Sequence, residues 1–185
     1  MEYVALEVKT SYSMLESLND ITKLVQKAKT LNYKYLAITD NNNMFGVPSF
    51  YHECIKNDIK PIIGITLDID NYKVILYAKN DLGYKNLIKL STIITERNIN
   101  IKEYKDNLVL VMPYRYYDKS IYDIYDTKYV GYSNILEKEK INDKKVLIND
   151  VSYLEKDDYK YLDYLIMIKE EKKLGEFELN TFKGK

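Results

Sequence analysis

The sequence predicts an α/β fold, built as a small or distorted barrel of mostly parallel strands. Short apolar runs rich in Val, Ile, Leu and Tyr recur along the 185 residues, and most are followed by a stretch with helical spacing of its apolar residues. The composition, 46% hydrophobic and 30% charged, is that of an ordinary globular domain. A regular eight-unit barrel typically needs about 250 residues, so this one must be smaller or irregular.

The expected elements follow one another in chain order. The first strand covers residues 4–8, and a helix follows Asn19 or Asp20, because the apolar residues from Ile21 to Leu31 recur three and four positions apart. Further strands are expected at 35–39, 60–67, 72–78, 108–112, 129–132 and 145–148, and further helices at 48–56, 81–95 and 156–172. The gap between residues 67 and 72 is too short for a parallel crossover, so an antiparallel hairpin is expected there.

Composition excludes several classes of protein. The 28 basic and 28 acidic side chains cancel, which argues against strong nucleic-acid binding by this chain alone. The apolar runs are far shorter than the roughly 20 residues of a membrane span, and no leader pattern opens the chain, so we expect a cytoplasmic protein. One cysteine and one histidine, Cys54 and His52, leave no disulfide and no metal centre built on several imidazoles. Both lie in a helical stretch, where we expect packing and surface roles.

The 6 glycines and 3 prolines are few for 185 residues, so turns must rely on Asn and Asp. No linker or fixed-period repeat divides the chain, and residues 1–185 are expected to form a single domain. The 20 tyrosines, dense between residues 114 and 132, are interpreted mainly as compositional bias; the alternatives are platforms for base stacking and, more favoured of the two, a partner-binding surface.

In α/β barrels, chemistry is found where strands reach their carboxyl ends. The residues there are Glu7, Lys9, Asp40, Asn41, Thr66, Tyr114, Asp150 and Ser152. Glu7 and Lys9 are two positions apart, so their side chains point to the same face of a strand. Asp40 is expected to cap the helix that follows it, because Asp and Asn readily accept local backbone hydrogen bonds.

Three stretches carry a family resemblance. Residues 6–15, 38–46 and 59–64 resemble, in order and spacing, the N-terminal PHP (polymerase and histidinol phosphatase) domain of the bacterial DNA polymerase III alpha subunit. Residues 78–87 are similar to the segment after that family's hairpin, and residues 149–154 to its last metal-binding motif. The resemblance implies a distorted TIM-like barrel of seven βα units, with metal ions held by histidines and carboxylates at the strand ends.

The family's ligand set is dismantled in this sequence. Its positions fall on Glu7, Lys9, Ser11, Asn41, Thr66, Tyr114, Asp150 and Ser152, of which Asp150 alone matches in type. A single ligand does not hold a metal cluster, and Lys9 would place a positive charge where a cation should bind. We therefore expect no metal and no cofactor, and an ion pair between Lys9 and Glu7 or Asp150, because a buried charge must be paired.

The resemblance thus implies a metal-free, catalytically inactive PHP domain that acts as a scaffold and partner-docking module in DNA replication. Nucleotidyl transfer would belong to the rest of a longer polymerase chain, of which these residues would be a fragment. The expected partners are the remaining polymerase domains and a separate exonuclease subunit. As a scaffold it would depend on core residues such as Ile63, expected beneath the third strand.

A metal-dependent phosphoesterase or proofreading exonuclease of the same superfamily is the alternative. It would use a magnesium site rebuilt from Glu7, Asp40, Asp68 and Asp150, since oxygen ligands alone suit that ion.

Overall fold

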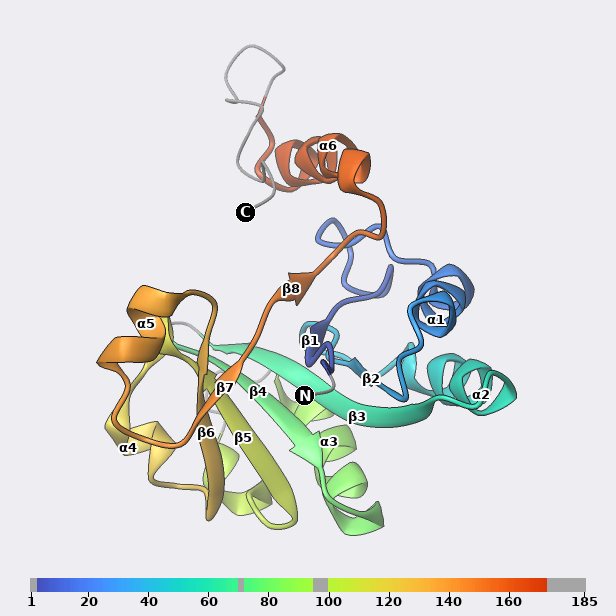
Figure 1. Ribbon diagram of the computed structural model, residues 1–185. Helices are drawn as coiled ribbons and strands as arrows, with labels where there is room; N and C mark the ends of the chain where they lie inside the picture. Colours follow the sequence, from blue (N-terminus) through green and yellow to red (C-terminus); the bar gives the residue numbers. More distant parts are fainter. Residues whose placement is uncertain (1–2, 70–71, 95–99, 173–185) are drawn as a thin grey trace.

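The computed structural model of the protein describes residues 3–69, 72–94 and 100–172. The strands form a curved wall, and helices lie on its outer side (Figure 1). The strands are β1 (Glu7–Val8), β2 (Tyr35–Ile38), β3 (Lys60–Ile69), β4 (Tyr72–Ala78), β5 (Leu108–Pro113), β6 (Thr127–Tyr132), β7 (Lys145–Leu147) and β8 (Asp150–Val151). The helices are α1 (Ile21–Thr30), α2 (Val47–Lys56), α3 (Asp81–Ile93), α4 (Lys119–Tyr122), α5 (Ile135–Lys140) and α6 (Tyr159–Lys169). Short 3₁₀ helices cover Ile101–Tyr104, Tyr114–Tyr116 and Lys156–Asp158.

The strand order is β2-β3-β4-β5-β6-β7 in one sheet, and β1 pairs with β8 in a second. Of the strands described, β4 alone runs antiparallel to its neighbours β3 and β5, which confirms the expected hairpin. Backbone bonds from Thr39 N to Val8 O (2.8 Å) and from Ala37 N to Ala5 O (3.3 Å) join β2 to the β1 segment. The chain runs from β7 directly into β8, so the two sheets together trace a distorted and incompletely paired ring, which agrees with the predicted barrel class.

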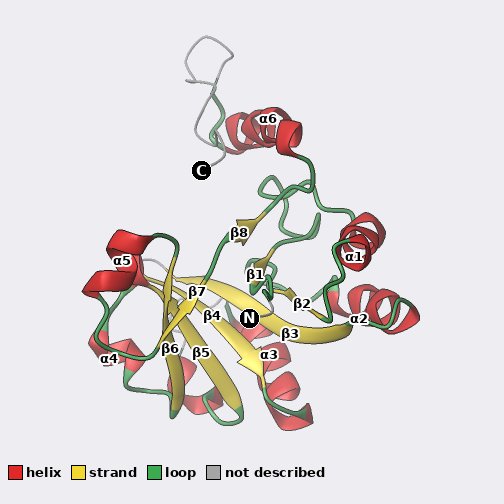
Figure 2. Cartoon of the chain, viewed as in Figure 1, coloured by secondary structure: helices red, strands yellow, loops and turns green. Residues whose placement is uncertain are grey.

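Alternate strand residues fill the two sides of this wall. Ala37, Ile75, Tyr77, Val111 and Ile148 form a small inner cluster, while the larger apolar core lies between the wall and the helices. Figure 2 shows the helices around the outside of the strands. Strand β4 is buried along nearly its whole length because both of its faces are covered.

Polar side chains begin the helices where the sequence predicts. Asp20 accepts a hydrogen bond from Lys23 N at the start of α1, and Asn80 accepts one from Gly83 N at the start of α3. Left-handed backbone conformations occur at Asn32, Asn42, Asp58 and Asn107, in keeping with the small number of glycines. Within the described residues, no helix is long and apolar enough to cross a membrane.

Several element boundaries differ from the expected ones. Strand β1 is only two residues long, β3 extends two residues further to Ile69, and the last helix begins at Tyr159 after a 3₁₀ turn. The end of the helix expected at 81–95 lies outside the described residues, beyond the observed end at Ile93. Helices α4 and α5 and strand β8 are absent from the prediction. Helix α5 leaves Ile135 and Leu136 71% exposed, so it shows no amphipathic pattern, and β8 exists through its pairing with β1.

Candidate functional site

The ends of β1 and β8 bring two of the predicted residues face to face. Glu7 of β1 is the register partner of Asp150 of β8. Both line a cavity of about 160 Å³, together with Tyr114, Arg115 and Glu137. This cavity lies at the mouth of the ring, on the side of Glu7 and Asp150, and the resemblance places the family's ligand positions around this mouth.

Lys9 forms the central ion pair of the mouth. Its ammonium lies 2.8 Å from Asp150 Oδ2 and 3.7 Å from Glu16 Oε2, and its side chain is only 6% exposed. Burial alone would lower the pKa of Lys9, but attraction and hydrogen bonding from Asp150, together with Glu16 and Glu7, raise it overall. The ammonium is therefore held in its charged form, and of the two predicted counterions Asp150 is the one observed within ion-pair distance. The hydroxyl of Ser152 also donates to Asp150.

Glu7 has a different partner, Lys73 of β4, at 3.9 Å. Burial and the nearby charge of Asp150 raise the pKa of Glu7, against the attraction of Lys73 and Lys9. Burial and the charge of Lys9 lower the pKa of Lys73. Lys73 was not among the predicted site residues. Its sequence signal is a lone lysine in an apolar strand, on the same face as the inner residues Ile75 and Tyr77.

Glu16 extends the network toward the end of the chain. It accepts hydrogen bonds from the amide of Asn41 and from the ammonium of Lys169 at the end of α6. Glu16 was also not predicted as a site residue, because it lies in an irregular loop that has neither helical nor strand periodicity. The charged network therefore joins β1, β8, the loop before α1, and α6.

Asp40 is not the helix cap that the sequence predicted. It is 1% exposed and accepts three hydrogen bonds, from Thr10 N (2.6 Å), Thr10 Oγ1 (2.7 Å) and Ser13 Oγ (2.6 Å). The residue before α2 is Gly46, which makes no side-chain capping bond. Asp40 thus holds the loop between β1 and α1, and the prediction failed because local capping competes with tertiary contacts that no spacing reveals.

The other predicted residues lie around this centre rather than in it. Ser11 is exposed, Tyr114 is half-buried at the cavity, and Thr66 is buried with its hydroxyl donating to Thr39 O at 2.9 Å. Asp68, a member of the proposed magnesium set, is exposed on β3. Among the residues described, no group of three or more His, Cys, Asp or Glu side chains is arranged to hold a metal ion.

This donor set does not fit the divalent metals of a hydrolytic centre. Asp150 is bonded to an ammonium, and Asp40 accepts three hydrogen bonds from hydroxyl and amide donors. A cation placed near Asp150 would be repelled by Lys9 and would have to displace it.

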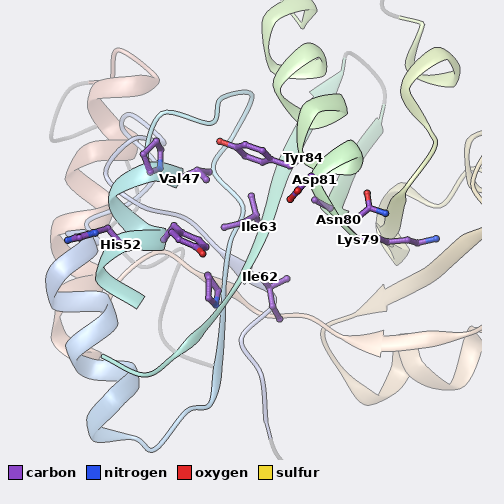
Figure 3. Close-up of a pocket in the computed structure, with 12 residues that line it drawn as sticks. Val47, His52, Ile62, Ile63, Lys79, Asn80, Asp81 and Tyr84 are labelled. Atoms are coloured by element: carbon purple, nitrogen blue, oxygen red, sulfur yellow. The ribbon is translucent and has the colours of Figure 1, made fainter. Parts of the chain in front are cut away.

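A larger cavity of about 710 Å³ lies away from the mouth, in the groove between α2 and α3 (Figure 3). Its floor is apolar and includes Ile63, which is half-buried rather than a core residue as expected. The reason is that β4 pairs with β3 only from Gly64 onward, so the preceding half of the strand lacks that neighbour. His52 is exposed at this groove, and Cys54 is buried, with burial raising the pKa of its thiol to about 12. The expected surface and packing roles of the two residues agree with this.

Residues 5–163 match the PHP domain, and the chain belongs to this family. The fold agrees, because the structure resembles a putative metal-dependent phosphoesterase from Bifidobacterium adolescentis, with a TM-score of 0.60 over 83% of this chain and 88% of that one. At 10% identity this likeness concerns the fold alone.

Among longer proteins, the chain is similar to the DNA polymerase III subunit alpha of several bacteria. It is 32% identical over 180 residues to that of Staphylococcus epidermidis, which covers 91% of this chain and 17% of that protein. It is 41% identical over 106 residues to that of Borreliella burgdorferi, covering 49% and 9%. The predicted resemblance is confirmed, and the chain spans about a sixth of the length of such relatives.

Proposed function

We propose that this chain is the PHP domain of a bacterial DNA polymerase III alpha subunit, and that it serves the polymerase as a metal-free scaffold without hydrolytic activity of its own. The observation that carries the proposal is the pair at 2.8 Å between the buried side chain of Lys9 and the partly exposed carboxylate of Asp150, at the mouth of the ring. Hydrolysis in a metal-dependent phosphoesterase needs a cation that activates water. Here a fixed ammonium takes the place of that positive charge.

The ion pairs supply a structural role in place of a catalytic one. Lys9 joins β1 to β8, and Glu16 connects this pair to α6 through Lys169. Such contacts hold together elements that are distant in sequence without any exchangeable ligand. In this proposal the nucleotidyl transfer is carried out by the rest of the parent chain, and the domain's partners are those remaining domains and a separate exonuclease subunit.

A phosphoesterase or exonuclease with a rebuilt oxygen-ligand site is the second candidate. The observation in its favour is that Glu7, Glu137 and Asp150 line one cavity. Lys9, Lys73 and Arg115 offset these carboxylates, and Asp40 and Asp68 lie outside the group, which weakens the case for this candidate.

Metal analysis and hydrolysis assays on the purified chain test the proposal. With Mg²⁺, Mn²⁺ or Zn²⁺ added, we expect no stoichiometric binding by calorimetry and no hydrolysis of DNA 3′ ends or phosphomonoesters. Binding of about one ion per chain, with an activity abolished by Asp150→Asn and kept by Glu155→Gln, would establish the second candidate instead. Glu155 is a matched control because it is an ion-paired carboxylate whose partner is Lys27 of α1 and whose side chain is 66% exposed.

A further inference from the structure

The last described helix, α6, is apolar around almost its whole circumference. Eight of its eleven residues are Tyr, Leu, Ile or Met, and its polar positions are Lys160, Asp163 and Lys169. A helix that is apolar all round is normally buried on every side. In Figure 1, however, α6 stands apart from the strands, at the far end of the domain. Its buried residues Leu162 and Met167 belong to neither of the two apolar clusters formed by the described residues.

One face of α6 is left open. Tyr161 is 61% exposed, Tyr164 44% and Ile168 62%. These positions are separated by three and four residues, so the three side chains lie on one face of the helix. Together they form a stripe roughly 10 Å long at 1.5 Å per residue, which we call the α6 stripe.

The helix is nevertheless held in a defined place. Lys169, in its last turn, pairs with Glu16, which in turn lies 3.7 Å from the ammonium of Lys9. A helix tied to the mouth at one end and exposing large apolar side chains is arranged to receive another surface. Exposed apolar groups of this kind mark contact sites when they lie together.

We propose that the α6 stripe docks against the polypeptide that follows residue 185 in the parent polymerase, so that α6 is the joint between the PHP domain and the next domain. This rests on the proposed function, since it requires the longer chain. The PHP family match ends at residue 163, inside α6, so this helix lies at the edge of the matched domain. The Staphylococcus epidermidis relative is matched over only 17% of its length, which leaves more than four-fifths of such a protein to be accommodated.

The size of the α6 stripe favours a tethered partner over a separate one. A stable complex of two free proteins typically buries about 800 Å² on each side and uses roughly 20 to 30 residues of each partner. Three side chains on an 11-residue helix offer much less than that. A segment joined to the same chain is present at an effective concentration of about millimolar, so a small apolar contact is enough to hold it.

The test uses the full-length polymerase with Tyr161, Tyr164 and Ile168 all changed to Ser. The matched control changes Ile135 and Leu136 of α5 to Ser, because both are 71% exposed and lie away from α6. Limited trypsin digestion then reports how often the region between the PHP domain and the next domain opens. We expect cleavage there to be about tenfold faster in the stripe variant and unchanged in the control, since proteolysis follows the population of the open form.

Equal cleavage rates in the stripe variant and the control would overturn the docking proposal. So would a concentration-dependent dimer of the polymerase that the stripe variant abolishes, because the occupant would then be a second copy. Circular dichroism verifies that the variant is folded, and the single change Ile168→Ser replaces the triple change if it is not. A reading frame that does not continue into a polymerase would refute the proposed function itself, which is a separate outcome.

Discussion

Replacing Lys9 by Met removes the charge at the centre of the mouth and keeps most of the side chain's apolar stem. In the folded protein the Lys9 ammonium is 2.8 Å from Asp150 and 3.7 Å from Glu16, and it also attracts Glu7. The substitution Lys9→Met therefore leaves three carboxylates near a site with one positive charge fewer. We expect a less stable protein with an unchanged fold.

The size of the loss follows from how far each carboxylate can reach water. Breaking a fully buried ion pair costs about 3–5 kcal/mol. The side chain of Asp150 is 39% exposed and that of Glu16 is 23% exposed, so solvent replaces part of the lost interaction. We therefore expect a loss of about 1–3 kcal/mol in unfolding free energy, in the range found when buried polar groups lose a partner.

The loss should depend on pH in a defined direction. Burial raises the pKa of Glu7 above its ordinary value of 4.5, so its contribution to stability is present below that value and disappears as pH rises through the folded pKa. Without Lys9 the pKa of Glu7 rises further, so the pH range over which stability declines extends to higher pH. The difference between Lys9→Met and the unchanged protein should thus be smaller near pH 4.5 than near pH 8.

Urea unfolding at both pH values measures these differences. The control is Lys27→Met, which removes an ion pair of similar length (2.6 Å) whose partners are 37% and 66% exposed. It should cost less than about 1 kcal/mol at either pH. A loss below about 0.5 kcal/mol for Lys9→Met, or one equal to that of Lys27→Met, would refute the view that the mouth depends on its lysine.

Asp40→Asn should lower the unfolding free energy by about 2–3 kcal/mol, because three hydrogen bonds to a buried carboxylate are weakened; a loss below that of an ordinary helix cap, about 1 kcal/mol, would count against this role. Gly83→Ala should destabilise the protein although alanine favours helices by about 1 kcal/mol, since a Cβ there would lie 2.2 Å from Asn107 O; a raised thermal midpoint would contradict this. In the full-length polymerase, Ile65→Asp should cost several kcal/mol and reduce nucleotide incorporation, because Ile65 is fully buried. Ser152→Ala should cost only about 1 kcal/mol, and equal effects of the two changes would argue against a scaffold.

The order and type of most elements could be predicted because each depends on a local pattern. The spacing of Ile21, Leu24, Val25 and Ala28 produces α1, and the short gap after β3 forces the hairpin with β4. Strand β8 could not be predicted, since two residues carry no periodicity and the strand depends on its partner β1. The half-burial of Ile63 was missed for a similar reason, because it depends on where β4 stops pairing.

The site shows the same division between local and distant causes. The pair between Lys9 and Asp150 could be predicted from the residue types at these two strand ends. Lys73 and Glu16 enter the mouth only through the curvature of the sheet and the course of a loop. Asp40 was assigned to a local cap because its real partners lie 27 and 30 positions earlier in the chain.

The short pair of β1 and β8 also has a consequence for how the protein forms during synthesis. Lys9 and Asp150 are 141 positions apart, and Asn19 reaches across 132 positions to donate to Val151 O. Contacts of such long separation carry a large loop-closure cost and form late. The hairpin of β3 and β4 can form while the chain is still growing, but the ring cannot close until residue 151 has emerged. Until then the first strand has β2 on one side but lacks β8 on the other, and Lys9 lacks Asp150. A truncation at either end of the domain therefore removes support from the other.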